Sequence, residues 1–214
     1  RPKPRKINLK ADLTQIITKD DLSVLSVDEI RTRINDAYKY DEWQYQFDNK
    51  IAIKDPNRAD HLNRILYQCQ SCLKEHEMIG KGTKLKCQAC GEEHELSIYG
   101  KLSNTNGETK IDHVPVWFEN QREFVKQEVL SGNYFFEDEV IIESLRNAKG
   151  FIRLPDGKLR HDMEGFHLTG TDFEGPLNLF RESTSMYTVH IEFNFKRSDK
   201  TTGDAIVLST DNDT

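Results

Sequence analysis

The sequence lacks long apolar runs, and this absence excludes a membrane-spanning helix. Its longest uninterrupted apolar stretch is the run of four residues from Ala205 to Leu208, whereas a transmembrane helix needs about 20 apolar residues. Apolar residues make up only 36% of the chain and charged residues 31%, so we expect modest hydrophobic cores. A length of 214 residues accommodates one large domain or two to three small ones.

A basic surplus and an export signal are missing as well. The net charge is -6, whereas nucleic-acid-binding domains usually carry a basic surface, so we expect no nucleic-acid partner. The basic run from Arg1 to Lys6 leads into no apolar segment of the secretory type. We interpret this run as a solvated linker broken by Pro2 and Pro4, with a contact to anionic lipid headgroups as the alternative. Because the chain starts without Met, we expect it to be a piece of a longer protein.

Cysteine is scarce, but all four cysteines fall into two Cys-x-x-Cys pairs. A two-residue spacer lets one tight turn direct both sulfurs at one ion, and four thiolates complete the tetrahedral coordination of zinc. Gly91 follows the second pair, where a tight turn favours a residue without a Cβ atom. We therefore predict one structural Zn²⁺ bound by Cys69, Cys72, Cys87 and Cys90. Coordination by four cysteines leaves no open position for a substrate.

Two other interpretations of the cysteines fit the sequence less well. Disulfides require an oxidising compartment, and nothing in the sequence indicates export. A redox-active Cys-x-x-Cys motif normally occurs once, at a helix start. His76 and His94 lie near the pairs and are alternative ligands. With four cysteines present, we expect both histidines to lie on the surface of the ribbon.

Turn signals and periodic patterns predict an α+β fold with four segments. These are a linker and helical segment (1–60), a zinc ribbon (61–100), a loop and amphipathic helix (101–135) and an antiparallel β-rich domain (136–214). In the first segment, Ser26 and Glu29 match a capping box before a helix that reaches about Tyr40. The next stretch, Asp41 to Lys50, has aromatic residues at alternate positions, which favours a strand or an extended packing arm.

The middle segments contain three short strand candidates and one helix. The strands are expected at Glu75–Ile79, Thr83–Lys86 and His94–Tyr99, with a turn at Gly80–Gly82. Apolar residues at helical spacing predict an amphipathic helix from Pro115 to Leu130 that ends near Gly132; they are Trp117, Phe118, Phe124, Val125 and Val129.

The C-terminal segment contains closely spaced short strands, which are typical of an antiparallel sandwich or a barrel-like region. The expected strands are Val140–Leu145, Phe151–Leu154, Lys158–Met163, Phe166–Thr169, Met186–Phe195 and Ala205–Ser209. Pro155–Gly157 and Glu164–Gly165 are expected hairpin turns. Alternation predicts a buried face made of Tyr187, Val189, Ile191, Phe193 and Phe195.

One acid–histidine pair is a candidate for catalysis in this segment. A two-residue loop at Glu164–Gly165 would place Asp162 opposite His167, and such pairs support general-base chemistry. No nucleophile elbow, phosphate loop or dinucleotide-binding glycine pattern accompanies the pair. We interpret it as an ordinary cross-strand polar pair, and we assign no catalytic and no cofactor-binding residue.

Several longer segments carry a resemblance to a known family. They are Arg58 to Cys69, Gly80 to Gly91, Gly107-Glu-Thr, His113 to Glu119 and Asp162 to Gly170. Together, over about residues 41–210, they resemble the region C-terminal to the acyltransferase domain in bacterial 1-acylglycerol-3-phosphate (lysophosphatidate) acyltransferases. The resemblance implies a non-catalytic accessory region of a phospholipid-biosynthesis enzyme. Its implied partner is the upstream acyltransferase domain of the same polypeptide. Its implied location is cytoplasmic, with peripheral attachment to the inner face of the cell membrane left open.

The family's catalytic motifs are not carried over to this chain. The resemblance implies an active site with a His-x4-Asp motif and a Pro-Glu-Gly-Thr segment upstream, and this sequence has no Pro-Glu-Gly-Thr. The run from His167 to Asp172 matches His-x4-Asp literally. We predict that this match is coincidental, because Gly170 and Thr171 favour a turn that would carry the aspartate away.

Two rival functions remain at this point. One is a zinc-ribbon module that binds nucleic acid or protein, and the other is a self-contained enzyme built on the β-rich segment. The stretch 67–100 holds four lysines (74, 81, 84, 86) against five glutamates (75, 77, 92, 93, 95). That acidic balance disfavours phosphate binding. The sequence leaves the oligomeric state open.

Overall fold

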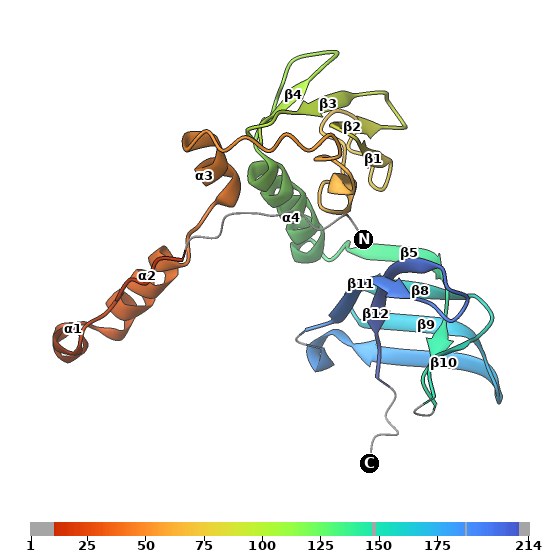
Figure 1. Ribbon diagram of the computed structural model, residues 1–214. Coiled ribbons are helices and arrows are strands. Elements are labelled where there is room, and N and C mark those ends of the chain that lie inside the picture. The colour runs from red at the N-terminus through yellow and green to blue at the C-terminus, as the bar shows by residue number, and fades with distance from the viewer. Residues whose placement is uncertain (1–10, 147–148, 187, 210–214) are drawn as a thin grey trace. The chain divides into compact units, whose positions relative to one another are not determined.

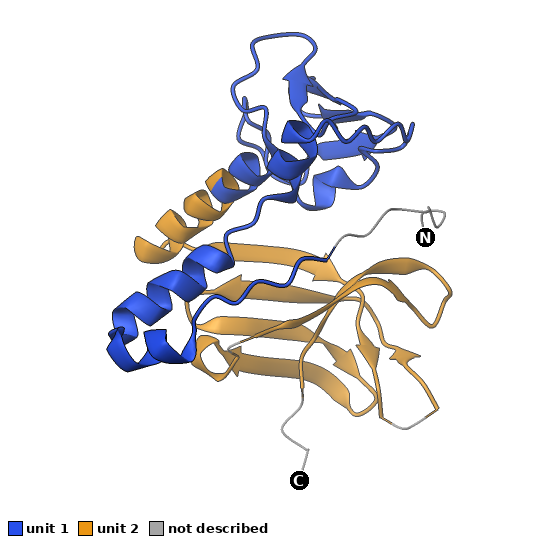
Figure 2. Cartoon of the chain, turned by 60° about the vertical axis from the view of Figure 1, so that its left-hand side comes forward, with its two compact units in different colours: residues 1–119 blue, residues 120–214 orange. Residues whose placement is uncertain are grey.

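Helices and antiparallel sheets both occur in the chain, which confirms the mixed α and β character (Figure 1). The computed structural model describes residues 11–146, 149–186 and 188–209. It divides into unit 1, residues 1–119, and unit 2, residues 120–214 (Figure 2). The basic run from Arg1 to Lys6 and the side chain of Tyr187 lie outside the described residues.

Short helices occupy the N-terminal part of unit 1: α1 (Lys19–Val24), α2 (Val27–Ala37) and α3 (Glu42–Asp48). The capping box before α2 is confirmed, because Ser26 Oγ accepts from the Glu29 N–H at 3.3 Å while the Glu29 carboxylate accepts from the Ser26 N–H at 2.8 Å. Such a cap satisfies two backbone donors that lack partners inside the helix.

The predicted strand or extended arm at Asp41–Lys50 is wrong, because this segment forms α3. Asp41 caps the helix by accepting a hydrogen bond from the Gln44 N–H at 2.9 Å. Trp43 and Phe47 are four residues apart and therefore share one helical side. Trp43 packs against the core of unit 1. The aromatic residues were thus compatible with helical spacing as well as with the alternation of a strand. The aspartate that caps the segment is the signal that favours the helix.

The ribbon of unit 1 is a four-stranded antiparallel sheet in the order β1-β2-β3-β4. Its strands are β1 (Met78–Lys81), β2 (Lys84–Cys87), β3 (Glu93–Leu96) and β4 (Leu102–Asn104), and a 3-10 helix, η1 (Leu62–Arg64), precedes them. The β1–β2 turn centres on Gly82, whose φ of +65° suits glycine. Gly80 lies within β1, where a Cβ atom would collide with the carbonyl oxygen of Ala59. The chain before the ribbon therefore packs directly against β1.

The core of unit 1 joins the ribbon to the start of helix α4 (Val114–Leu130). It is formed by Ala59, Leu62, Leu66, Cys69, Met78, Leu85, Cys87, Leu96, Leu102, Val114 and Trp117. The helix agrees with the predicted amphipathic helix. Gly132, with a φ of +73°, follows its end, and the N–H of this glycine donates to the Val129 carbonyl at 3.1 Å. Left-handed glycines of this kind are common helix terminators.

Unit 2 contains a four-stranded antiparallel sheet in the order β10-β9-β8-β5, together with two two-stranded hairpins (Figures 1 and 2). The sheet strands are β5 (Phe135–Val140), β8 (Gly157–Asp162), β9 (Gly165–Asp172) and β10 (Gly175–Glu182). The hairpin strands are β6 (Glu143–Ser144) with β7 (Ile152–Arg153), and β11 (His190–Lys196) with β12 (Thr202–Val207). A second 3-10 helix, η2 (Ser183–Ser185), follows β10. The buried side chains of this unit include Ile142, Leu154 and Leu159.

The predicted topology of unit 2 is correct in part. The turn at Glu164–Gly165 does join two paired strands, β8 and β9. The turn at Pro155–Gly157 does not, because β7 pairs with β6 while β8 pairs with β5. The sequence analysis also missed β10, in which exposed and half-buried residues alternate although its polar and apolar residues do not. In the described residues no closed barrel forms, and the sandwich stays a prediction.

The predicted buried face of β11 is wrong for its central residues. Ile191 and Phe193 are 50% and 65% exposed, because among the described strands β11 pairs with β12 alone. Phe195 is partly buried, and its ring packs edge-to-face on Phe151 with centroids 5.0 Å apart. Alternation therefore identified the strand correctly but not the surface that its apolar side faces.

Candidate metal centre

Two turns with the same hydrogen-bond pattern present the four cysteines. The N–H of the first cysteine in each turn donates to a carbonyl five residues later, Cys69 to Lys74 at 3.0 Å and Cys87 to Glu92 at 2.8 Å. Its carbonyl accepts the N–H four residues later, from Leu73 at 3.2 Å and Gly91 at 3.0 Å. Leu73 and Gly91 occupy equivalent positions and both have positive φ, +59° and +79°. The turn predicted at Gly91 thus has a counterpart at Leu73.

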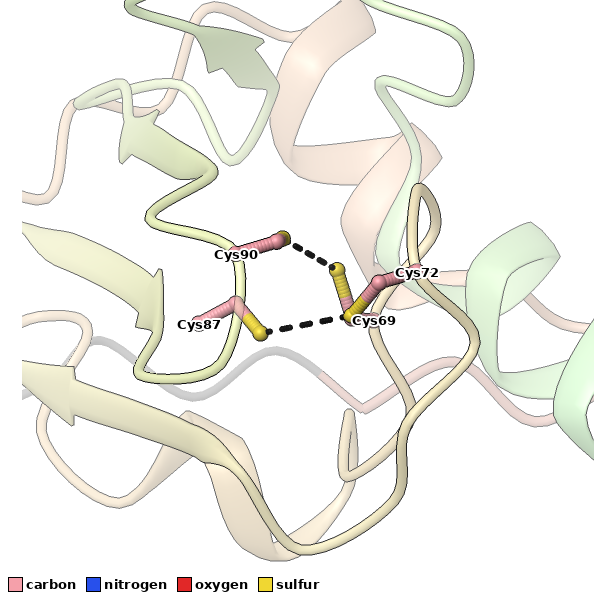
Figure 3. Close-up of side chains that lie close together, drawn as sticks. All are labelled: Cys69, Cys72, Cys87 and Cys90. Atoms are coloured by element: carbon pink, nitrogen blue, oxygen red, sulfur yellow. Dashed lines mark hydrogen bonds between the residues drawn. The ribbon is translucent and has the colours of Figure 1, made fainter.

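The two turns face one another and bring all four sulfurs into one cluster (Figure 3). The Sγ atoms of Cys69 and Cys90 are 3.6 Å apart, and those of Cys72 and Cys87 are 3.7 Å apart. A tetrahedral ion with metal–sulfur bonds of about 2.3 Å holds its sulfurs about 3.8 Å apart. All four cysteines are free thiols. The donor set and its spacing therefore fit one tetrahedral metal ion.

Burial and backbone donors act in opposite directions on the thiols. Burial raises the pKa of Cys69, so this thiol holds its proton tightly until a cation replaces it. The backbone N–H of Lys74 lowers the pKa of Cys72. The N–H of Ser71 approaches Cys69 Sγ at 3.4 Å. Backbone N–H groups of the two cysteine turns can thereby stabilise the negative charge that four thiolates leave around a divalent ion.

A buried carboxylate, Glu92, lies directly beside the sulfur cluster. Its Oε2 is 3.0 Å from Cys69 Sγ, while its Oε1 accepts from Ser71 Oγ at 2.8 Å and from Asn104 Nδ2 at 3.0 Å. The residue is only 6% exposed. Burial opposes ionisation of Glu92, but hydrogen bonds from Cys69 and Ser71 hold its pKa below the usual value. The cluster therefore has an anionic neighbour that is fixed by two neutral donors.

His94 is buried, so the expectation that it lies on the ribbon surface is wrong. It is fully inaccessible, with Nε2 3.5 Å from Glu92 Oε1 and its ring edge-to-face with Trp117 at a centroid distance of 5.0 Å. Burial lowers its pKa, which favours the neutral ring. His76 does lie exposed, where it stacks on Tyr67 at 5.6 Å. Neither histidine belongs to the group of clustered sulfur ligands.

Sequence analysis missed Ser71, Glu92 and Asn104 as neighbours of the metal ligands. One signal for Glu92 was present, because Glu92, His94 and Leu96 alternate and therefore share one side of β3. Leu96 is the apolar member and is buried. Two polar residues on the inward side of a strand indicate a specific role. The partners themselves were out of reach, since Ser71 is 21 residues away from Glu92 along the chain.

The Glu92→Gln substitution is expected to preserve or tighten metal binding. The glutamine Oε1 can still accept from Ser71 and Asn104, and its Nε2 takes the place of Oε2 and donates to the Cys69 thiolate. A hydrogen bond to a charged group contributes about 1.5–3 kcal/mol, and about 1.4 kcal/mol is a tenfold change in affinity. We therefore expect zinc affinity equal to wild type or up to about 100-fold tighter. Competition with a chromophoric chelator measures this directly. The matched control is Glu93→Gln, which removes an acid that pairs outward with Lys84 at 2.6 Å and should leave affinity unchanged. A loss of affinity confined to Glu92→Gln would contradict this account.

The second candidate pair, Asp162 and His167, lies close together but not in the expected register. His167 stands opposite Arg160, and Asp162 lies two residues further along β8. The His167 Nε2 is nevertheless 3.5 Å from Asp162 Oδ1, because diagonal neighbours on one side of a sheet remain in reach.

The literal His-x4-Asp match does not form a catalytic pair, although the physical reason differs from the predicted turn. Gly170 and Thr171 lie inside β9, which continues to Asp172. Residues five apart in a strand point to opposite sides. The Asp172 carboxylate instead pairs with Arg146 at 3.3 Å. His167 and Asp172 therefore cannot act as a hydrogen-bonded unit in this strand.

No protein-family model, curated protein or solved structure matches this chain at a significant level. Among the described residues, no helix combines the length and the apolar character that crossing a bilayer requires. The sulfur cluster is thus the feature on which a functional assignment for unit 1 depends.

Proposed function

We propose that Cys69, Cys72, Cys87 and Cys90 bind one zinc ion and that this ion stabilises unit 1. The observation that supports the proposal is the sulfur cluster, with separations of 3.6 and 3.7 Å between partners from opposite turns. Thiolates select soft or borderline cations, and a tetrahedral four-sulfur site suits zinc. Cys69 and Cys87 also belong to the hydrophobic core of unit 1. An ion held there links the core to both turns.

The proposed role of the zinc is structural and not catalytic. Four cysteine ligands fill a tetrahedral shell, so no position remains for water or substrate. The acidic balance of the ribbon disfavours nucleic acid as its partner, since Lys84 is already paired with Glu93. Unit 1 is therefore best suited to act as a rigid module.

We further propose that the chain is an accessory region of a lysophosphatidate acyltransferase, cytoplasmic and working beside the acyltransferase domain of the same polypeptide. The support is the resemblance of several segments, and these segments contribute to the interior of unit 1. Arg58 donates through Nε to the Leu96 carbonyl at 2.5 Å, and Asn63 Oδ1 accepts from the Gly80 N–H at 3.1 Å. Trp117 donates to the Gln68 carbonyl at 2.9 Å. The resemblance therefore involves residues that determine the fold of the ribbon.

The purified chain is expected to show no acyl transfer to lysophosphatidate. Its one His-x4-Asp run lies along a single strand with His167 and Asp172 on opposite sides, so it provides no general-base pair. The measurement is a labelled-acyl assay with acyl-CoA and with acyl carrier protein as donors. A longer chain that includes the segment upstream of Arg1 serves as the positive control. Turnover by the short chain that disappears in His167→Ala would refute the accessory role. An inactive longer chain would refute the acyltransferase assignment.

A further inference from the structure

The tip of the β8–β9 hairpin in unit 2 gathers three side chains that can ligate a metal. Asp162 ends β8, Glu164 lies in the turn, and His167 is the third residue of β9. Their ligand atoms all lie within 4.8 Å of one another. His167 Nε2 is 3.5 Å from Asp162 Oδ1 and 3.8 Å from Glu164 Oε2. Adjacent ligands of a first-row cation with bonds of about 2.1 Å are separated by about 3.0–3.4 Å, so small rotations of these side chains complete the geometry.

Strand register explains why these side chains converge. His167 is directly opposite Arg160, and Asp162 lies two residues after Arg160 on the same strand. The side chains of Arg160, Asp162 and His167 therefore occupy one side of the sheet. The turn is tight because Gly165, with a φ of +139°, approaches the backbone of β10. A Cβ atom at this position would collide with the Arg181 carbonyl oxygen. The glycine thereby holds the turn, and with it Glu164, near the histidine.

The histidine and one carboxylate are already oriented by their neighbours. Asp162 Oδ1 accepts from the Glu164 N–H at 2.9 Å, and Asp162 Oδ2 lies 2.8 Å from Arg160 Nε. The His167 ring packs on Phe180 at a centroid distance of 4.5 Å. Its Nε2 atom is buried, yet within the described part of the chain it makes no hydrogen bond. A buried ring nitrogen without a hydrogen bond, directed at two carboxylates, is the arrangement that a metal ion satisfies.

We propose that Asp162, Glu164 and His167 form a second metal site, for one divalent first-row transition cation. One imidazole nitrogen and two carboxylate oxygens suit manganese, iron or zinc, whereas calcium and magnesium prefer oxygen ligands alone. The Glu164 side chain is 74% exposed, so the remaining coordination positions open to solvent. The site differs from the cysteine cluster in both donor type and unit, and it does not depend on the proposed zinc role of unit 1.

The test uses the full chain, loaded first with one equivalent of zinc, which the four thiolates of the cysteine cluster bind in preference to the three ligands of the hairpin. Mn²⁺ is then added, and unbound Mn²⁺ is measured by its electron paramagnetic resonance signal. Manganese accepts oxygen and imidazole ligands but competes poorly with zinc for thiolates. Two variants remove ligands: His167→Ala, and Glu164→Gln, which changes only an exposed turn residue. His190→Ala is the matched control, because it removes an exposed histidine from the separate β11–β12 hairpin.

We expect one Mn²⁺ per zinc-loaded chain with micromolar affinity in wild type and in His190→Ala. Loss of even an outer neighbour of a metal ligand weakens binding 10- to 100-fold, so each ligand variant should bind at least about tenfold more weakly. Equal affinity in wild type and Glu164→Gln would overturn the proposal, whether or not His167→Ala folds. Millimolar binding shared by all four proteins would overturn it as well, since it would indicate only general attraction to surface acids.

Discussion

Replacing Cys87 with serine is expected to release the zinc ion and unfold unit 1. Cys87 is fully buried and belongs to the core cluster, so the substitution removes a ligand and places a hydroxyl among apolar side chains. Structural zinc contributes on the order of 10 kcal/mol to the folding of isolated finger peptides. That contribution is comparable with the whole stability of a typical domain, about 5–15 kcal/mol. Three remaining ligands bind zinc far more weakly than four, so unit 1 loses most of its stability.

Unit 2 is expected to remain folded in the same variant. It has buried apolar residues of its own, including Ile142, Leu154 and Leu159, and the cysteine cluster lies entirely in unit 1. Limited proteolysis followed by mass spectrometry should show cleavage throughout residues 1–119 and protection of the sheet strands of unit 2. Both tryptophans, Trp43 and Trp117, belong to unit 1. Their fluorescence therefore reports the unfolding of that unit alone.

The adjacent substitution Lys86→Ser provides the matched control. Lys86 is exposed on β2, one residue before the ligand, so it should keep one zinc per chain and the wild-type proteolysis pattern. Metal analysis distinguishes the outcomes: the expected zinc content of Cys87→Ser is well below half an equivalent. If Cys87→Ser retained a full equivalent of zinc and native tryptophan fluorescence, the assignment of the cluster as a zinc site would be wrong.

Local signals were sufficient for the cysteine cluster and for the start of α2. The Cys-x-x-Cys spacing defines a turn that is closed by its own backbone hydrogen bonds, such as Cys69 N–H to the Lys74 carbonyl at 3.0 Å. The capping box at Ser26 is likewise complete within four residues. Interactions of this kind depend on neighbouring residues, so the sequence predicts them without knowledge of the tertiary fold.

The pairing of strands that are distant in the sequence could not be predicted from local signals. The hairpin of β6 and β7 is inserted between β5 and β8, and β5 then pairs with β8 across it, with Val140 opposite Gly157. Nothing in the turn Pro155–Gly157 indicates that its two flanking strands belong to different sheets. The burial of His94 could not be predicted from the sequence either. Its ring is fully buried and contacts Trp117, which belongs to a helix that begins 20 residues further along the chain. Both outcomes depend on tertiary contacts, which override local patterns.

Replacing Trp117 with alanine is expected to destabilise unit 1 strongly, although less than removal of a cysteine of the cluster. Trp117 is 2% exposed and is among the largest fully buried side chains. Its indole N–H donates to the carbonyl of Gln68, the residue before Cys69, at 2.9 Å. The side chain therefore ties helix α4 to the first cysteine turn. Truncation of a buried tryptophan to alanine costs about 3–5 kcal/mol.

Urea unfolding of the zinc-loaded chain measures this loss through Trp43 fluorescence and circular dichroism. With a denaturant dependence of about 2 kcal/mol per molar urea, a loss of about 4 kcal/mol lowers the midpoint by about 2 M. Val116→Ala is the matched control, because Val116 lies beside Trp117 on α4 but is 47% exposed. This variant should lose no more than about 0.5 kcal/mol of unfolding free energy.

The substitution Trp117→Phe separates the hydrogen bond from the packing. A phenyl ring can keep much of the contact with His94, whereas the donor to the Gln68 carbonyl is lost, which costs about 1 kcal/mol in addition to the smaller ring volume. We therefore expect a stability between wild type and Trp117→Ala, and zinc release at a correspondingly intermediate urea concentration. Because binding of a structural metal is generally coupled to folding, we expect zinc release and unfolding of unit 1 to coincide in every variant. A Trp117→Ala protein that unfolds at the wild-type midpoint would show that α4 contributes little to holding the cysteine turns.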